Sequence, residues 1–151
     1  MKIPENSQYV LFGGTFVLAN KMQYVADRKV GGLSTKQWFL LRTLQDMPSE
    51  PAPTITSLAR ETDTTRQNTA KMLEILRRQG YVILKNNPHD HRSSIVELTG
   101  QGKRTLGVMA AESEAFFREL FKDIDDQDCE TAAKVLIQMV SALNKMQEEM
   151  Q

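Results

Sequence analysis

The chain of 151 residues lacks the features that mark secreted and membrane proteins. Its one cysteine, Cys129, cannot form an intramolecular disulfide, which fits a reducing compartment. No apolar run approaches the roughly 18 residues of a membrane span, and the N-terminal apolar stretch lacks the basic flank of a signal peptide. Hydrophobic residues make up 40% and charged residues 25% of the sequence. We therefore expect one cytoplasmic globular domain over residues 1–151, with no membrane partner.

Patterns that carry catalysis or metal binding are also missing. No glycine-rich phosphate loop follows a predicted strand, and there is no nucleophile motif. His89, Asp90 and His91 are consecutive in one polar loop, without the second pair of ligands that a zinc site needs. Cys129 falls on the apolar stripe of the last predicted helix, where a buried structural thiol is favoured over a redox sensor. We expect no enzyme, no cofactor and no metal.

The net charge of zero hides an uneven distribution of charge along the chain. Residues 54–104 carry nine Lys/Arg and five Asp/Glu, which gives a local charge of +4. Residues 105–151 carry four basic and ten acidic residues, and residues 1–53 carry six and four. A basic segment beside an acidic one indicates that one part of the chain faces phosphates and another does not.

The basic segment has the order helix, turn, helix and hairpin. TITSLARE and RQNTAKMLEILRRQG have helical spacing and are separated by the polar turn TDTT. YVILK and IVELT are predicted strands on either side of the loop NNPHDHRSS. This order is typical of a winged helix-turn-helix, whose second helix enters the major groove of double-stranded DNA.

The second helix of this unit opens with side chains that suit base recognition. Thr64 is the expected N-cap, because Gln67 then completes a capping box, and Thr65 is the alternative one position later. Arginine can bind guanine with two hydrogen bonds, and asparagine or glutamine can bind adenine in the same way. The candidate contacts on the exposed face are Arg66, Gln67, Asn68 and Lys71, while Met72, Leu73 and Leu76 are expected to face the core.

The loop of the predicted hairpin carries a second candidate contact. Arg92 lies at its tip, where a guanidinium can enter the narrow minor groove. Asp90 is two residues earlier and is expected to hold the Arg92 side chain by a bidentate pair. A loose surface ion pair is the alternative interpretation of these two residues.

Helices are predicted on both sides of the winged unit. The first covers residues 7–30, and its Gly13–Gly14 pair indicates close packing or a kink. The next covers residues 34–46, with Ser34 and Gln37 as a capping box and with Leu33 and Trp38 as a hydrophobic staple, and the proline-rich linker MPSEPAP follows it.

The last third of the chain is predicted to be two amphipathic helices, with Asp125 as the cap between them. Their apolar stripes continue beyond what one small domain can cover. We therefore expect residues 5–32 and 103–151 to form a dimerisation region that pairs with a second copy of the chain.

Three segments resemble the MarR (multiple antibiotic resistance regulator) family of transcription factors: LSTKQWFLLRTL, SLARETDTTRQNTAKMLEILRRQGYV and DHRSSIVELTGQG. The most specific match is Asp90-x-Arg92 followed by Leu98-Thr99-x-x-Gly102. The resemblance implies a mainly α fold, with a winged helix-turn-helix module over residues 33–102, a small β-hairpin wing and long N- and C-terminal dimerisation helices. It further implies a repressor that binds a pseudo-palindromic operator as a homodimer. Carried over by position, the DNA contacts are Thr65, Arg66, Gln67, Asn68, Lys71, Asp90 and Arg92.

The resemblance also implies a possible small aromatic effector, bound between the dimerisation helices and the winged module. Its candidate pocket consists of Phe12, Phe16, Trp38, Phe39 and Arg42, although ordinary core aromatics are the simpler interpretation of each ring. Asp63 stands in the turn where the family often has glycine, between two threonines where apolar residues are commoner. The alternative function is a winged-helix module that binds a protein partner and has weak or non-specific affinity for DNA.

Overall fold

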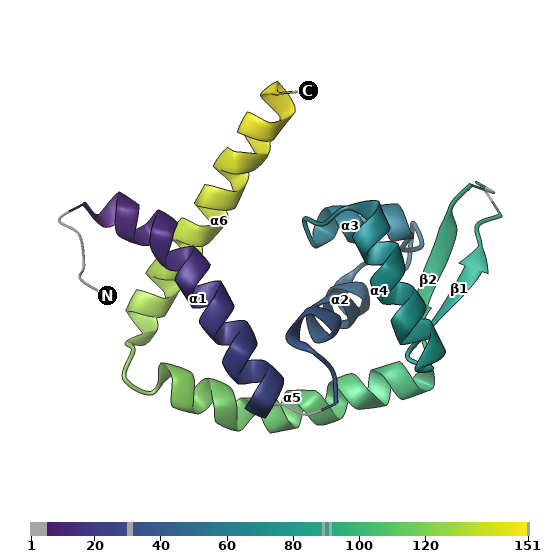
Figure 1. Ribbon diagram of the computed structural model, residues 1–151, viewed down its shortest axis with the longest axis horizontal. Helices are drawn as coiled ribbons and strands as arrows, with labels where there is room; N and C mark the ends of the chain where they lie inside the picture. Colours follow the sequence, from purple (N-terminus) through teal and green to yellow (C-terminus); the bar gives the residue numbers. More distant parts are fainter. Residues whose placement is uncertain (1–5, 30–31, 89, 91, 151) are drawn as a thin grey trace. The chain divides into compact units, whose positions relative to one another are not determined.

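The computed structural model describes residues 6–29, 32–88, 90 and 92–150, and its contacts divide the chain into two units. Unit one is Met1–Glu114 and unit two is Ala115–Gln151. The elements along the chain are α1 (Ser7–Lys29), α2 (Thr35–Asp46), α3 (Ile55–Glu61), α4 (Arg66–Arg78), β1 (Val82–Asn86), β2 (Ser94–Leu98), α5 (Gly100–Phe121) and α6 (Asp126–Glu149) (Figure 1). The predicted fold class, mainly α with a small β-hairpin, is confirmed.

The start of α2 is fixed by hydrogen bonds within its own sequence and by one residue of α1. Ser34 and Gln37 form the predicted capping box, in which the Gln37 backbone donates to Ser34 Oγ at 3.3 Å and the Ser34 backbone donates to Gln37 Oε1 at 3.0 Å. Asp27, in the last turns of α1, accepts a 2.6 Å hydrogen bond from the backbone of Thr35. A carboxylate at this place also complements the positive end of the α2 dipole.

The hairpin pairs β1 and β2 antiparallel, from Val82 opposite Leu98 to Asn86 opposite Ser94. Val82 and Val96 are buried on the inner face of the sheet. The backbone N–H of Val96 donates to the carbonyl of Pro53 at 2.8 Å, so the end of the α2–α3 linker lies against the open edge of β2. This contact fixes the base of the hairpin to the start of α3.

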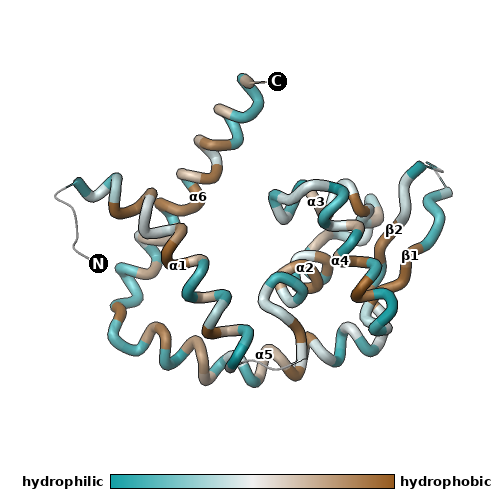
Figure 2. Tube along the Cα trace, viewed as in Figure 1, coloured by the Kyte–Doolittle hydropathy of each residue, from teal (hydrophilic) through white to brown (hydrophobic). Residues whose placement is uncertain are grey.

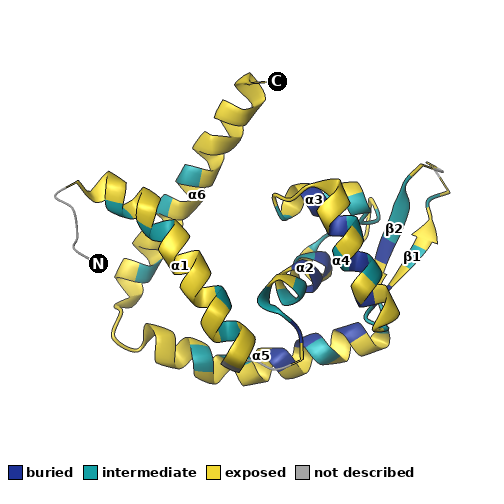
Figure 3. Ribbon diagram, viewed as in Figure 1, coloured by how far each residue is buried: buried dark blue, intermediate teal, exposed yellow. Residues whose placement is uncertain are grey.

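The core of unit one lies between α2, α3, α4, the hairpin and the first turns of α5. The dark blue of Figure 3 lies on these elements and, at Leu33, just before α2. Its buried members are Leu33, Leu40, Leu41, Leu44, Leu58, Leu73, Leu76, Val82, Val96, Leu106 and Met109. Leu33 and Trp38 both contribute to it, as the predicted staple requires, and Met72 packs against its edge.

Helix α1 runs without interruption through Gly13 and Gly14. A Cβ atom at either glycine would meet nothing within 4 Å, so no described contact explains the pair. The aromatic side chains of α1 are largely exposed, with Phe12 at 59% and Phe16 at 62% of their full accessibility.

In unit two, α6 begins after its predicted cap, because Asp125 Oδ1 accepts a hydrogen bond from the backbone of Gln127 at 2.8 Å. No described residue of α6 is buried, and Cys129 is only partly covered, so the burial predicted for this thiol is not seen in the single chain. Brown and teal alternate along α6 in Figure 2, as its amphipathic pattern requires. Within the described residues, no helix has both the length and the hydropathy to cross a membrane.

Candidate nucleic-acid interface

Helices α3 and α4 form a helix-turn-helix whose angle is set by a tight polar turn. Thr54 and Ser57 cap α3 reciprocally, and the core residues Leu58 and Leu73 are fully buried. In the turn Asp63 has a φ of 49°, in the left-handed region that aspartate tolerates better than most residues. The backbone N–H of Thr64 then donates to the carbonyl of Ala59 at 2.9 Å. Asp63 thus takes the place of the glycine that is common in such turns.

The N-cap of α4 is Thr65, and the first expectation, Thr64, is wrong. Thr65 Oγ1 accepts a hydrogen bond from the backbone of Asn68 at 3.2 Å. The hydroxyl of Thr64 instead contacts that of Thr69 at 2.7 Å. Thr64 therefore lies outside the helix, and the capping box with Gln67 does not form. Since the Thr65 hydroxyl serves as the cap, its remaining hydrogen-bonding capacity is what a DNA phosphate could use.

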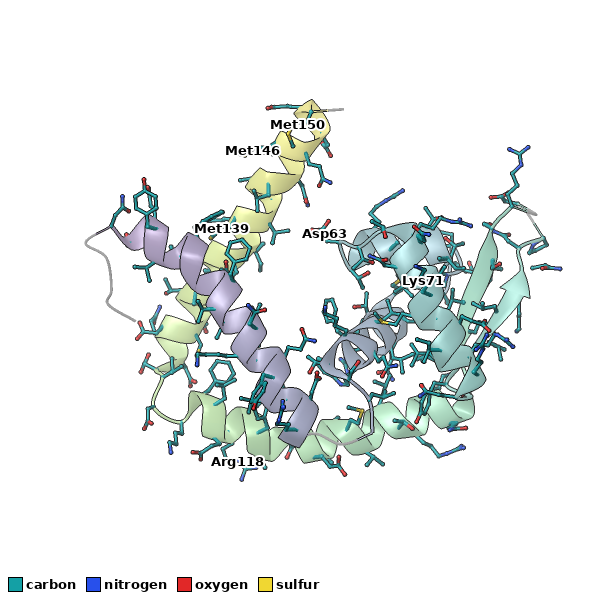
Figure 4. The ribbon with its side chains drawn as sticks, viewed as in Figure 1. Asp63, Lys71, Arg118, Met139, Met146 and Met150 are labelled. Carbon is teal, nitrogen blue, oxygen red and sulfur yellow. The ribbon has the colours of Figure 1, made fainter. Side chains whose placement is uncertain are left out.

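The four polar side chains at the start of α4 are all exposed: Arg66, Gln67, Asn68 and Lys71. No described ion pair involves Arg66 or Lys71; the ion pairs of α4 lie in its last turns, where Arg77 and Arg78 both bind Glu74 at 2.8 and 2.9 Å. These two guanidinium groups hold the pKa of Glu74 at about 2. The positive charge of the first turns is therefore available to a partner, whereas that of the last turns is partly neutralised. Figure 4 shows Lys71 on α4 and Asp63 at the turn.

The tip of the hairpin is organised by Asp90, though not as predicted. Asp90 Oδ1 accepts a hydrogen bond from the backbone N–H of Arg92 at 3.0 Å, and the Asp90 carbonyl accepts one from the backbone of Ser93 at 3.0 Å. The expected bidentate pair with the Arg92 guanidinium is absent from the described contacts. An aspartate readily binds the backbone two residues ahead, which shapes a turn and leaves the arginine side chain exposed. His89 and His91 lie outside the described residues, and the described part of the chain contains no cluster of metal ligands.

The C-terminal end of α4 is joined to the start of α5. Gly80 ends α4 with a φ of 82°, and its carbonyl accepts a 2.6 Å hydrogen bond from the hydroxyl of Thr99. The same Thr99 hydroxyl accepts from the backbone of Gly102 at 3.0 Å. A Cβ atom on Gly102 would overlap the carbonyl oxygen of Tyr81. The Leu98-Thr99-x-x-Gly102 motif is therefore a structural joint that fixes the end of α4 to α5.

No described contact joins all five residues of the predicted effector pocket, which stays a prediction. The rings of Phe12 and Phe16 contact each other edge to face at 5.5 Å, and Trp38 packs against the core. Arg42 forms an exposed ion pair with Asp46 at 2.9 Å. Phe39 lines an open groove of about 660 Å³ together with Lys71, Met72 and Ile75.

Two features of the site were not predicted from the sequence. Thr69 is, among the residues that the structure describes, the one polar side chain that is buried. A threonine at a position where helical spacing predicts an aliphatic residue was the available signal. The hydrogen bond that the Thr35 backbone at the start of α2 donates to Asp27 was also missed, because it joins two helices and no local pattern marks it.

Comparison with known proteins relates the chain to bacterial regulators. A model of the MarR family matches residues 31–93. The chain is 25% identical over 139 residues to the transcriptional activatory protein BadR of Rhodopseudomonas palustris, an alignment that covers 90% of this chain and 79% of that protein. Its fold is similar to that of a MarR protein from Peptoclostridium difficile, with a TM-score of 0.81 and 18% identity, over 100% of this chain and 97% of that chain. A transcriptional regulator of M. tuberculosis, MOSR, in complex with DNA, gives a TM-score of 0.72 and 22% identity, over 87% and 96%.

Proposed function

We propose that this protein is a transcription regulator of the MarR type that binds a specific DNA sequence, because a model of the MarR family matches residues 31–93. In this proposal the start of α4 enters the major groove, and the hairpin tip lies at the adjacent minor groove. The observation that carries the proposal is the exposed group at the start of α4, in which neither Arg66 nor Lys71 is neutralised by a described ion pair.

Some side chains of this surface suit the recognition of bases, which gives specificity, and others suit contacts with the DNA backbone, which give affinity. Gln67 and Asn68 present amide groups, which suit adenine, and Arg66 presents a guanidinium, which suits guanine. Lys71, Thr65 and the exposed Arg92 suit phosphate or the minor groove. Asp90 contributes indirectly, by forming the turn that presents Arg92.

We propose that the protein acts as a homodimer that binds a pseudo-palindromic operator. Support comes from α6, which has no buried residue and exposes a row of apolar side chains at helical spacing: Leu136, Ile137, Val140, Leu143 and Met146. In water such a row favours association, because covering it removes apolar surface from solvent. The aromatic residues of α1 are similarly exposed. A second copy of the chain would place two α4 helices one helical turn of DNA apart.

We further propose that the protein represses transcription and that a small aromatic compound releases it from DNA. Repression follows if the dimer occupies a promoter and blocks transcription. Release by a small aromatic compound would require a ligand that prefers a dimer geometry with the two α4 helices out of register with the operator. Titration of the DNA complex with phenolic compounds tests the release, and an affinity that never changes excludes it for the compounds tried.

The test of the proposal is selection of bound sequences from random duplex DNA with the full chain. We expect enrichment of two inverted half-sites whose centres are about 10 base pairs apart. The absence of any enriched sequence contradicts specific binding. If affinity for DNA is also insensitive to salt, the alternative function as a protein-binding winged helix is favoured, because phosphate contacts release counterions and make binding steeply dependent on salt.

A further inference from the structure

Three threonines connect the end of α3 to the first turns of α4 through their hydroxyl groups. Thr62 Oγ1 donates to the carbonyl of Leu58 at 2.8 Å. Thr62 Oγ1 and Thr64 Oγ1 are 3.3 Å apart, and Thr64 Oγ1 and Thr69 Oγ1 are 2.7 Å apart. We call Thr62, Thr64 and Thr69 the threonine chain.

The direction of these hydrogen bonds follows from the number of protons. Each hydroxyl has one proton to donate. Since the proton of Thr62 goes to Leu58, the contact between Thr62 and Thr64 needs the proton of Thr64. The contact between Thr64 and Thr69 then needs the proton of Thr69. All three bonds form together only if Thr69 donates to Thr64, Thr64 to Thr62, and Thr62 to the α3 backbone.

The position of Thr69 allows the threonine chain to fix the orientation of α4. Thr69 is 1% exposed and lies on the buried side of the helix. At about 100° per residue, Gln67 and Lys71 each lie roughly 200° from it, on the opposite face. An aliphatic side chain at this place would pack without a preferred direction, whereas a hydrogen bond requires a particular distance and angle. Rotation of α4 about its axis would break the bond and turn Gln67 and Lys71 away together.

We propose that the threonine chain sets the rotation of α4 and thereby determines which bases its exposed face can recognise. Thr64 and Thr69 are thus positioning residues, which touch no DNA and act through Gln67 and Lys71. The inference rests on the proposed function, since it requires α4 to read DNA. It also gives a role to the polar turn, where the apolar residues common in the family are replaced by threonine.

The test compares Thr69→Val with Thr69→Ser in the full chain. Valine keeps the volume and removes the hydroxyl, whereas serine keeps the hydroxyl. Binding is measured to the duplex obtained by selection and to random duplex, well below the unfolding temperature of each variant. For Thr69→Val we expect affinity for the selected duplex to fall about three- to tenfold, the usual effect of one hydrogen bond. Affinity for random duplex, which depends on phosphate contacts, should be unchanged. Thr69→Ser should keep the preference of the original chain.

Two further variants keep the test decisive. Thr64→Val removes the central hydroxyl of the threonine chain at an exposed position, so it tests the proposal if Thr69→Val does not fold. The double variant should lose no more preference for the selected duplex than either single variant. Thr43→Val is the matched control, because Thr43 is half-buried in α2 and is not part of the threonine chain. It should keep the full preference for the selected duplex. If both valine variants discriminate as the original chain does, or lose affinity for the two duplexes in parallel, the inference is overturned while the proposed function stands. If the original chain itself shows no preference, the proposed function fails first, and the inference fails with it.

Discussion

The hydroxyl of Thr99 donates a 2.6 Å hydrogen bond to the carbonyl of Gly80 and accepts one from the backbone of Gly102. This one side chain therefore closes the C-terminal end of α4 and begins α5. The joint matters for the proposed regulator because α5 leads from the winged module toward the helices that we propose to dimerise. The start of α5 and the end of the proposed recognition helix are therefore held by the same side chain.

Replacement of Gly102 by alanine should disturb this joint. The added Cβ atom would overlap the backbone carbonyl of Tyr81, which cannot rotate away as a side chain can. We expect a loss of about 1–3 kcal/mol in the free energy of unfolding, as for other cases of overpacking. Chemical denaturation monitored by circular dichroism measures it. Gly107→Ala is the matched control in the same helix, since nothing lies within 4 Å of its Cβ position. It should be neutral or stabilising by about 0.5–1 kcal/mol. Equal effects of the two substitutions would show that close approach at Gly102 is unimportant.

Replacement of Arg92 by alanine should weaken DNA binding and leave dimerisation intact. The Arg92 side chain is exposed and takes part in no described ion pair, so its removal disturbs no side-chain contact among the described residues. If the guanidinium contacts DNA, the slope of log affinity against log salt should decrease by about one. Fluorescence anisotropy with a labelled duplex measures this slope. Lys134→Ala removes the same charge from α6 and should leave the slope unchanged. Identical affinity for Arg92→Ala and the original chain would refute the wing assignment.

A charge on the apolar row of α6 should convert the proposed dimer to monomer. Val140 is 58% exposed in the single chain and lies in the middle of that row. Burying an aspartate at an apolar interface is costly, so Val140→Asp should favour the monomer at micromolar concentration. Sedimentation equilibrium gives the mass. Gln138→Asp, on the opposite face of α6, adds the same charge and should remain dimeric. A monomeric original chain would contradict the homodimer.

The start of α2 should make stability depend on pH through Asp27. Hydrogen bonds from the Thr35 side chain and backbone hold the pKa of Asp27 below its usual value. A carboxyl with a lowered pKa in the folded state stabilises the fold above its unfolded pKa of about 4, and this contribution is lost as pH falls through the folded value. The melting temperature of the original chain should therefore exceed that of Asp27→Asn at neutral pH, and the difference should narrow in acid. A difference that stays constant with pH would exclude this role for Asp27.

Local patterns predicted several caps, turns and core positions in both units. The capping box of Ser34 and Gln37 and the cap at Asp125 were found because each depends on residues within one turn of the chain. Asp63 lies in the turn where the sequence placed it, with a φ of 49°. The pattern of apolar residues likewise placed Leu73 and Leu76 in the core.

Features that depend on tertiary contacts were predicted less well. The cap of α4 was first assigned to Thr64, because the sequence does not reveal that Thr69 binds its hydroxyl. Asp90 was expected to bind the Arg92 side chain. It binds the backbone N–H of Arg92 instead, which costs less side-chain entropy because the long arginine side chain need not be ordered. The effector pocket was inferred from a resemblance, and it stays a prediction.

The central claim is that the exposed start of α4 and the wing bind DNA with sequence specificity. Its most direct test is a titration of the full chain with the selected duplex and with a scrambled duplex of equal composition, between about 50 and 200 mM salt. We predict that affinity for both falls steeply with salt, and that the selected duplex is bound at least about 10³-fold more tightly near physiological salt. Equal affinities for the two duplexes, or affinities that do not change with salt, would contradict the account.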